Sequence, residues 1–446
     1  MTGHPPRGSI VQLVQKPRHE LLSTMTRKEH MQATMAQDLA ALSREMSGRP
    51  VGSIANREAA DHVAGRLARC GYDIERQTFS CRDWSCASAS LRIDGSEILD
   101  FRPNPNTPSC DHLAEALVIE DLESLEGQRL EGRIVVLRAG LAEQQIVPRR
   151  YPFYQVEEHQ RLLALLEAAG PAAIVGASPR PDCLEPLFED GDLGVPNATI
   201  SKEFAAGLRS GVTVELRLDC TSSPAHGENV LGHRVAPSVG RNRISRSSGL
   251  GAGRTVLTAH LDTKPGTPGA IDNASGVTVL LTLAELLSSA EHCPELEIAI
   301  LNGEDHYAAA GQVEYLRLLG ERPPPALAVN VDGVGISHAA GTSTSAARYE
   351  DPKDTVARFG LTPEQGATLD RLLVESRAMV EMDPWPMGDH MLFVARGIPA
   401  LAIASERSFE LIETVVHTPK DRLELISTAR LAETALFLKA LVLAIG

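Results

Sequence analysis

Five side chains that could bind metal ions are spread over the C-terminal half of this 446-residue chain. They are His260, Asp272, Asp305, Asp332 and His417. Zinc accepts imidazole nitrogen and carboxylate oxygen at roughly 2.0–2.2 Å, and two metals about 3.5–4 Å apart can share one bridging carboxylate. Asp272 is the candidate bridge, because it lies in a turn of small residues that opens an expected helix.

Two further acids beside these candidates could perform the remaining chemistry. Glu304 directly precedes Asp305 and could act as a general base, which takes a proton from water and delivers it to a leaving amine. Asp262 follows His260 by two residues and could accept the second ring N–H, which would set the orientation of the imidazole. Singly, such motifs are common in solvated turns. Together and in this order, they predict a metal site with its own general base.

The elements that must position these residues alternate between strand and helix from residue 225 onward. The expected strands are 255–260, 296–301, 326–331 and 400–404, and the expected helices are 276–289, 309–319, 363–379 and 427–445. Continuous apolar strands that alternate with helices are typical of a largely parallel sheet covered on both faces. Ligands of such sheets bind at the carboxyl ends of the strands. The candidates that follow the first three strands should therefore converge.

The motifs resemble, in sequence order, those of the cocatalytic-zinc exopeptidases, which include bacterial leucyl aminopeptidases and glutamate carboxypeptidase. The matching segments are His260-Leu261-Asp262, Gly269–Val277, Glu304-Asp305, Asp332 and His417-Thr418. Gly388-Asp389-His390 is similar to the Ser-Asp-His stretch of the family, with glycine in place of serine. The resemblance covers roughly residues 31–446. It implies an α/β fold with a mixed, mostly parallel sheet flanked by helices.

The resemblance also implies a cofactor, a reaction and a role for each candidate. The cofactor would be two zinc ions, with a single ion as the alternative. One zinc would be held by His260, Asp272 and Asp332, and the other by Asp272, Asp305 and His417. Glu304 would be the general base. Asp262 would be the second catalytic residue, which accepts the other ring N–H of His260. The implied activity is that of a metallo-aminopeptidase, which hydrolyses the N-terminal peptide bond of a peptide.

Three features depart from the family pattern. Asp305 stands where many members have glutamate, and its shorter side chain could weaken or shift the second metal. His306 follows directly and could compensate or compete as a ligand. Some members also have a tyrosine before the last histidine that stabilises the oxyanion. Residues 410–416 contain no tyrosine, so that role is unassigned.

Two other functions stay open at this point. An amide hydrolase or a glutaminyl-cyclase-like enzyme would keep the metal chemistry and act on a small metabolite. A non-catalytic binding module of the same fold would typically lose metal ligands, whereas all five are present here. The loop Met379–Met391 contains Glu381, Asp383, Trp385 and Met387, which could form a side-chain pocket and bind a substrate amine.

The N-terminal half predicts a more complex domain organisation. Residues 1–30 are expected to form a leader, and residues 31–100 and 225–446 the zinc peptidase domain. Residues 101–224 read as an inserted β-rich module that resembles a protease-associated domain. Short strands are expected within 77–100, and the small, polar segment 221–224 is expected to be a linker.

Composition and charge restrict the partners and the location. The chain has 43 basic and 58 acidic residues, a net charge of −15, which disfavours binding to nucleic acid. The sequence contains no run of 18 or more apolar residues and no export signal, so we expect no membrane association and a cytoplasmic location. The seven cysteines show no metal-binding spacing and are expected to be free thiols. The expected partner is a peptide or a small amide, and oligomerisation is left open.

Overall fold

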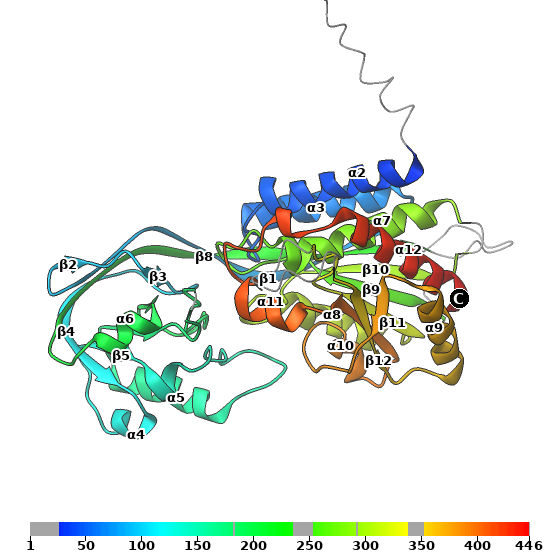
Figure 1. Ribbon diagram of the computed structural model, residues 1–446. Coiled ribbons are helices and arrows are strands. Elements are labelled where there is room, and N and C mark those ends of the chain that lie inside the picture. The colour runs from blue at the N-terminus through cyan, green and yellow to red at the C-terminus, as the bar shows by residue number, and fades with distance from the viewer. Residues whose placement is uncertain (1–25, 182, 235–252, 291–292, 338–351, 446) are drawn as a thin grey trace, which may run out of the picture.

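The computed structural model describes residues 26–181, 183–234, 253–290, 293–337 and 352–445. In these residues the chain forms two bodies joined by a long ribbon (Figure 1). The expected leader lies outside the described residues except for its end, where α2 (Arg27–Ala40) begins. Thr26 and Glu29 form a capping box there, because each side chain accepts a hydrogen bond from the backbone N–H of the other.

A mixed sheet forms the centre of the larger body. Its four central strands are parallel, in the order β14 (Ala400–Ser405), β11 (Leu327–Val331), β9 (Thr255–His260) and β10 (Leu296–Leu301). Antiparallel strands flank them on both sides, β8 (Thr213–Arg234) beside β10 and β12 (Asp354–Phe359) beside β14. The short strand β13 (Met379–Glu381) is parallel to β12 at the edge. The expected fold class, a mostly parallel mixed sheet between helices, is confirmed.

The strands β12 and β13 were not predicted from the sequence. β12 begins with Asp354 and includes Arg358, so it lacks the continuous apolar pattern that marks the central strands. The Asp354 carboxylate accepts hydrogen bonds from the Gly335 N–H and the Thr434 hydroxyl. A polar residue is therefore tolerated at a buried position because its hydrogen bonds are satisfied within the fold.

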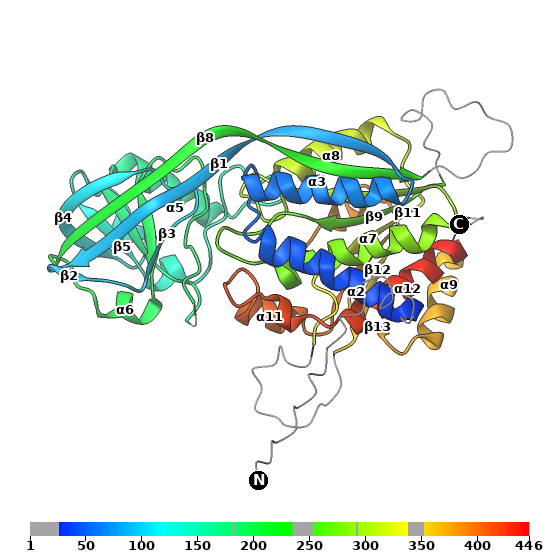
Figure 2. The same ribbon diagram turned by 90° about the horizontal axis from the view of Figure 1, so that it is seen from above.

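Helices cover both faces of this sheet. One face carries α2, its π-helical extension Ala41–Glu45, α3 (Ile54–Arg69), α7 (Ser275–Ser288), α9 (Pro363–Glu375) and α12 (Thr428–Ile445). In the view from above, α2, α3, α7 and α12 lie across that face (Figure 2). The other face carries α8 (Ala310–Glu321) and α10 (Met391–Val394). Neighbouring β9 residues divide between the two cores, Leu257 toward the first face and Val256 toward the second, as the two-residue repeat of a strand requires.

The helix α7 with its preceding turn is the most apolar helical segment at the centre of the fold. Ala270–Ser288 is long and apolar enough to cross a membrane, and 89% of its apolar window is buried inside the protein. It packs between α12 and the sheet in the largest hydrophobic cluster. Burial on all sides explains its composition, as in the core helix of a globular domain.

A two-stranded ribbon connects the larger body to the smaller one. β1 (Asp73–Ile93) and β8 pair antiparallel over their whole lengths, with Asp73 opposite His233 and Ile93 opposite Val214. Figure 2 shows this ribbon running from the helix-covered sheet into the smaller body. Two expectations are corrected here. Residues 77–100 contain most of the long strand β1 and the two-residue strand β2 (Ser96–Glu97) instead of several short strands. Residues 221–224 lie inside β8 instead of forming a linker, because ladder pairing with β1 continues through them.

The smaller body has its own sheet and its own hydrophobic core. β4 (Cys110–Ile119), β5 (Ile134–Leu137), β6 (Ala173–Ala177) and β7 (Asn197–Ile200) are parallel neighbours, β4 is antiparallel to β8, and β3 (Phe101–Pro103) is antiparallel to β7. The remaining elements are β2 (Ser96–Glu97), α4 (Leu122–Leu125), the 3₁₀ turn Ala139–Ala142, α5 (Glu157–Ala169) and α6 (Lys202–Gly207). The assignment of 101–224 to a protease-associated module stays a prediction. All seven cysteines are free, as expected.

The helix α12 offers a matched test of the core. Leu438 is fully buried, whereas Leu436 on the same helix is 44% exposed. We expect Leu438→Ala to lower the free energy of unfolding by about 2–5 kcal/mol, because it removes buried methyl groups and leaves a cavity. Leu436→Ala should cost about 0.5 kcal/mol or less. Urea unfolding followed by circular dichroism measures both, and equal losses would contradict this packing.

Candidate metal centre

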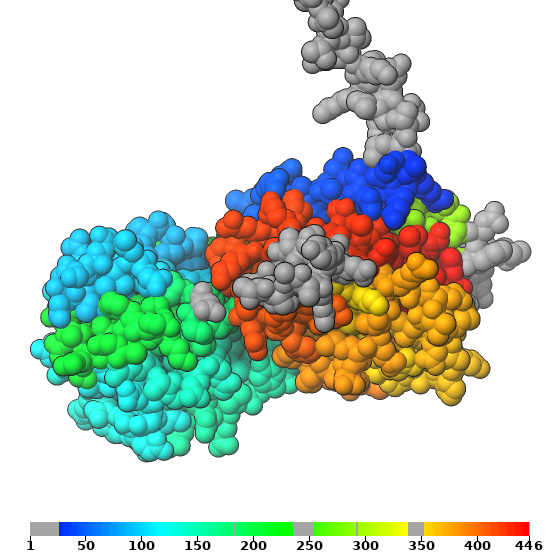
Figure 3. Space-filling view, viewed as in Figure 1, coloured from blue at the N-terminus to red at the C-terminus, as the bar shows by residue number. Residues whose placement is uncertain are grey.

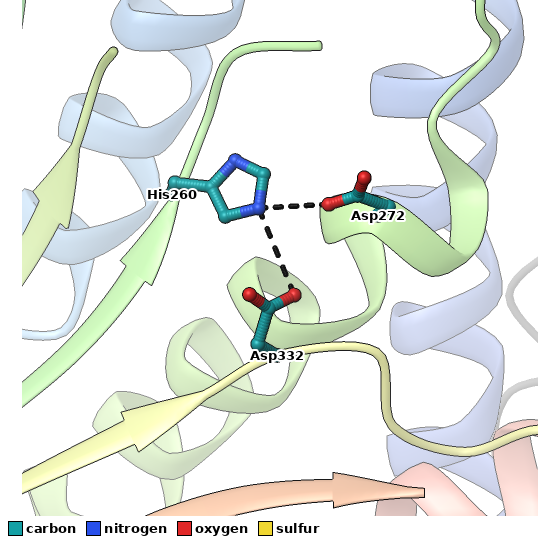
Figure 4. Close-up of side chains that lie close together, drawn as sticks. All are labelled: His260, Asp272 and Asp332. Carbon is teal, nitrogen blue, oxygen red and sulfur yellow. Dashed lines mark ion pairs between the residues drawn. The ribbon is translucent and has the colours of Figure 1, made fainter. Parts of the chain in front are cut away.

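The five predicted ligands meet at the carboxyl edge of the central sheet, in two groups that share Asp272. His260 is the last residue of β9, and its Nε2 lies 2.8 Å from Asp272 Oδ1 and 3.6 Å from Asp332 Oδ1 (Figure 4). His417 Nε2 lies 3.0 Å from both Asp272 Oδ2 and Asp305 Oδ1. Each oxygen of Asp272 therefore faces a different imidazole, which is the arrangement of a bridging carboxylate.

Several of these atoms are buried and lack hydrogen-bond partners. They are His260 Nε2 and both carboxylate oxygens of Asp305. Their contacts are as short as hydrogen bonds but lack hydrogen-bond geometry, and an unsatisfied buried polar atom is costly. A zinc ion binds imidazole nitrogen and carboxylate oxygen atoms that converge on one point. The residues present thus fit the two-zinc centre that the sequence predicts.

The carboxylates beside the two imidazoles raise the pKa of both rings. Burial acts to lower the pKa of His260, but the charges of Asp332 and Asp272 outweigh it and raise that pKa well above its usual value. The pKa of His417 is likewise raised, against the effect of burial, by Asp305 and Asp272. Bound zinc would take over this charge compensation, and each imidazole would lose its proton.

The backbone around Asp272 is held by residues from the last loop. The carboxylate of Asp421 accepts hydrogen bonds from the backbone N–H groups of Ile271 and Asp272. Asn273, joined to Asp272 by a cis peptide bond, donates to the carbonyl of Val331, next to Asp332. Burial raises the pKa of Asp421 to about 7, and the two N–H donors oppose that shift. Asp421 therefore positions a ligand without being one.

Asp262 has a different contact from the one expected. The Nδ1 atom of His260 faces the backbone carbonyl of Asp262 at 3.1 Å, while the nearest carboxylate oxygen lies 3.7 Å away. That carboxylate instead accepts hydrogen bonds from three successive backbone N–H groups, at 2.6, 3.2 and 3.0 Å. The donors are Gly303, Glu304 and Asp305. Asp262 thus fixes the loop that carries the proposed base and a ligand.

Arg49 is a positioning residue that sequence reasoning missed. Its side chain is fully buried, and its guanidinium donates to the carbonyls of Leu261 and Gly269, which lie next to two ligand-bearing segments. Burial lowers the pKa of Arg49 to about 10, a shift that the nearby acids, led by Asp421, oppose. Arg49 lies between Gly48 and Pro50, and no local sequence pattern marks it as a buried cation.

Glu304 lies at a cavity of about 210 Å³ that also reaches the metal ligands. Burial raises the pKa of Glu304 well above its usual value; Asp305 and Asp332 add to that shift, and His260 opposes it. A carboxylate with a raised pKa is suited to accept and return a proton near neutral pH. The cavity is lined mainly by apolar side chains, including Met382, Trp385 and Phe409.

The loop Met379–Met391, which was predicted to form a side-chain pocket, contributes only some of its residues to the cavity. Trp385 and Met387 line the cavity. Glu381 does not line it and forms an ion pair with Arg358. Burial raises the pKa of Asp389 to about 7, and its carboxylate accepts a hydrogen bond from Gln312. The loop thus contributes an apolar wall and a buried acid.

His306 is not part of either group among the described residues. Its Nδ1 accepts a hydrogen bond from the Ala308 N–H, and its ring packs against Tyr307. Burial and the charge of Lys264 lower the pKa of His306 to about 4. The ring is therefore engaged locally, while the shorter Asp305 still reaches His417.

The smaller body contacts the rim of this centre. Lys264 forms an ion pair with Glu189 at 2.6 Å. The guanidinium of Arg180 donates hydrogen bonds to the carbonyls of Glu413 and Val416, and Val416 directly precedes His417. These carbonyls belong to α11 (Ser408–Thr414) and the residues that follow it. The space-filling view shows the two bodies in contact beside this red-orange segment (Figure 3).

Comparisons with known proteins agree with this geometry. Residues 243–442 match the sequence model of Peptidase family M28. Aminopeptidase YwaD of Bacillus subtilis (strain 168) is 23% identical over 415 residues, which cover 91% of this chain and 82% of that protein. The structure of BSAP, a zinc aminopeptidase from Bacillus subtilis, has a TM-score of 0.69 and 20% identity, covering 92% of this chain and 94% of that one. The fold expected from the sequence is thereby confirmed.

One further relative corrects the expected location. The probable lipoprotein aminopeptidase LpqL of Mycobacterium tuberculosis (strain ATCC 25618 / H37Rv) is 23% identical over 284 residues, which cover 61% of this chain and 51% of that protein. A lipoprotein among the relatives contradicts the prediction of a cytoplasmic protein. That prediction rested on the missing export signal, and the first residues of the printed chain do not decide the location.

The shared carboxylate makes a specific prediction for metal content. The wild-type chain should hold about two zinc ions after loading and dialysis. Asp332→Asn and Asp305→Asn should each leave about one, and Asp272→Asn should leave well below one, because it removes a ligand from both groups. Elemental analysis by mass spectrometry measures this, with the exposed Asp100→Asn as the control. Two zinc ions retained in Asp272→Asn would show that this residue is not a bridge.

Proposed function

We propose that the chain is a zinc-dependent aminopeptidase, and the match of residues 243–442 to Peptidase family M28 supports this proposal. It would hydrolyse the first peptide bond of a peptide with a free amino end. The observation that carries this proposal is the pair of ligand groups joined by Asp272, with unpartnered lone pairs aimed between them.

The metals would be held by the residues of these two groups. His260 and Asp332 complete one site with Asp272, and Asp305 and His417 complete the other. Bound zinc supplies Lewis-acid chemistry, which polarises a carbonyl and makes water more acidic. The protein residues fix the ligand directions, since Asp262, Asp421 and Arg49 hold the backbone on which the ligands stand.

Glu304 would move the proton. Its carboxylate takes a proton from the attacking water and then donates it to the nitrogen of the departing amine. The cavity that Glu304 borders is lined largely by apolar side chains, so charges inside it interact more strongly than they would in bulk water. A single carboxylate can therefore serve as base and then as acid in the same turnover.

The charges around the cavity favour an amino end over a carboxyl end. Asp272, Asp332 and Glu304 all line it. Bound zinc would balance the charges of the ligands Asp272 and Asp332, whereas Glu304 is outside both ligand groups and its carboxylate would attract the ammonium group at the start of a peptide. The net charge of −15 also supports a peptide partner over nucleic acid.

The walls of the cavity suggest which first residue is preferred. Its apolar lining includes Met382, Trp385, Met387, Phe409 and Ile412. A cavity of about 210 Å³ with these walls would accept a large apolar side chain such as leucine or methionine. We further propose that the body built on residues 101–224 is a protease-associated-like module that borders this site.

The role of Glu304 is tested by Glu304→Gln. The amide cannot accept the proton, so kcat for a leucyl-nitroanilide should fall by about 10²–10⁴-fold, while zinc content stays near that of the wild type. The exposed Glu406→Gln serves as the control. Acylated amino acids, which have no free amino end, are tested in parallel. Their hydrolysis would indicate an amide hydrolase instead of an aminopeptidase. Full activity of Glu304→Gln would remove this residue from its role.

The apolar wall is tested by Trp385→Ala. Loss of the indole should lower kcat/KM for a leucyl substrate by about 10–200-fold, the range expected for lost apolar contacts in a binding pocket. The effect on an alanyl substrate should be much smaller, because its methyl group does not reach the wall. The exposed Leu99→Ala is the control. Equal losses for both substrates would argue against this pocket.

A further inference from the structure

Two cysteines face each other across the ribbon that joins the two bodies (Figure 2). Cys86 on β1 is directly opposite Cys220 on β8 in the antiparallel ladder. Directly opposed residues of such a ladder place their side chains on the same face of the sheet. Both side chains pack against the hydrophobic core of the smaller body. The two thiols are free in this structure.

The backbone makes these cysteines a close pair. The N–H of Cys220 donates to the hydroxyl of Ser109 at 2.9 Å, and that hydroxyl donates to the carbonyl of Cys220 at 2.6 Å. Ser109 directly precedes β4, so both backbone polar groups of Cys220 point toward β4 and away from β1. Cys86 and Cys220 are therefore a non-hydrogen-bonded pair of the ladder, the kind whose Cα atoms are about 4.5 Å apart. Disulfides span Cα separations of about 4.4–6.8 Å.

A third cysteine of the smaller body is less well placed. Cys110 on β4 is opposite Leu218 on β8, so it lies diagonal to Cys220. Diagonal neighbours are about 7–8 Å apart, and cysteines separated by more than about 7 Å cannot be bridged without a movement of the backbone. The Sγ of Cys110 donates a hydrogen bond to the carbonyl of Leu216 at 3.5 Å. Cys110 is therefore a suitable control for the Cys86–Cys220 pair.

The exposure of the two thiols sets the order in which they would react. Cys86 is partly exposed, whereas Cys220 is buried. Burial raises the pKa of Cys220 above its usual value, and the adjacent thiol of Cys86 adds to the shift. The thiolate and not the thiol attacks a disulfide. An oxidant therefore meets Cys86 first, and Cys220 is the second thiol to react.

We propose that Cys86 and Cys220 form a disulfide bond by exchange with a small-molecule disulfide. The Cys86 thiolate attacks one sulfur of the oxidant, which forms a mixed disulfide and releases one thiol. The Cys220 thiolate then attacks the Sγ of Cys86, which breaks the mixed disulfide and releases the second thiol. The two cysteines lose two electrons and two protons, and the oxidant gains both and becomes two thiols.

This bond encloses most of the smaller body. The loop between the two cysteines is about 130 residues long and contains the strands from β2 to β7 and the helices α4, α5 and α6. A cross-link that closes a long loop lowers the entropy of the unfolded chain and so stabilises the folded one. Oxidation therefore stabilises the smaller body, whose contacts at Lys264 and Arg180 reach the loops of the metal centre. The inference does not depend on the proposed aminopeptidase function.

The test incubates the full-length protein with oxidised glutathione at about pH 8.5, near the pKa of a free thiol, and then denatures it and alkylates it with N-ethylmaleimide. The reduced protein offers seven thiols; the oxidised one should bind two fewer maleimides, and peptide mass spectrometry should find Cys86 linked to Cys220. In Cys220→Ala the second step is missing, so a Cys86–glutathione adduct should accumulate. Cys110→Ala and Cys81→Ala are matched controls that should form the link, since Cys81 is opposite Ala225.

Thermal unfolding followed by circular dichroism measures the effect of the bond. Oxidation should raise the melting temperature of the wild type by about 5–10 °C, and dithiothreitol should reverse the rise. Cys220→Ala treated in the same way should show no rise. A wild type in which Cys86 stays unmodified, keeps its glutathione adduct or is linked to Cys110 overturns the inference. A Cys86–Cys220 link that leaves the melting temperature unchanged contradicts its stabilising role.

Discussion

The concentration of negative charge at one edge of the sheet is the constraint on which this structure depends. Seven carboxylates gather there, from Asp262, Asp272, Glu304, Asp305, Asp332, Asp389 and Asp421. Buried charges of one sign are expensive unless cations compensate them. Arg49, Lys264 and two imidazoles supply positive charge in the described chain. Two divalent cations between the ligand groups would complete the balance.

Residues of one chemical type have two different uses in this cluster. Asp272, Asp305 and Asp332 place carboxylate oxygens in the two candidate metal groups, and both oxygens of Asp305 lack a hydrogen-bond partner. Asp262 and Asp421 direct theirs to backbone N–H groups. The difference comes from the local backbone, because an acid surrounded by N–H donors becomes a structural acceptor. Arg49 complements them by donating hydrogen bonds to the carbonyls of Leu261 and Gly269.

The smaller body is part of this arrangement. The ribbon of β1 and β8 fixes it to the larger sheet, and polar contacts at Lys264 and Arg180 hold it against the loops around the metal centre. These contacts lie next to ligands in the sequence, since Lys264 is four residues from His260 and Val416 directly precedes His417. A displacement of the smaller body would therefore be felt at the metal centre and at the cavity mouth.

The sequence by itself predicted the candidate ligands, the candidate general base and the central strands, and the structure brings those candidates together. Those features follow from residue type and from periodic apolar patterns, which are local properties of the chain. Only the tertiary structure decided the hydrogen-bond partners of Asp262, the buried position of Arg49 and the continuity of β8 through 221–224. Each of these depends on contacts between segments far apart in the chain, and no local pattern encodes which distant N–H, carbonyl or carboxylate a side chain will meet.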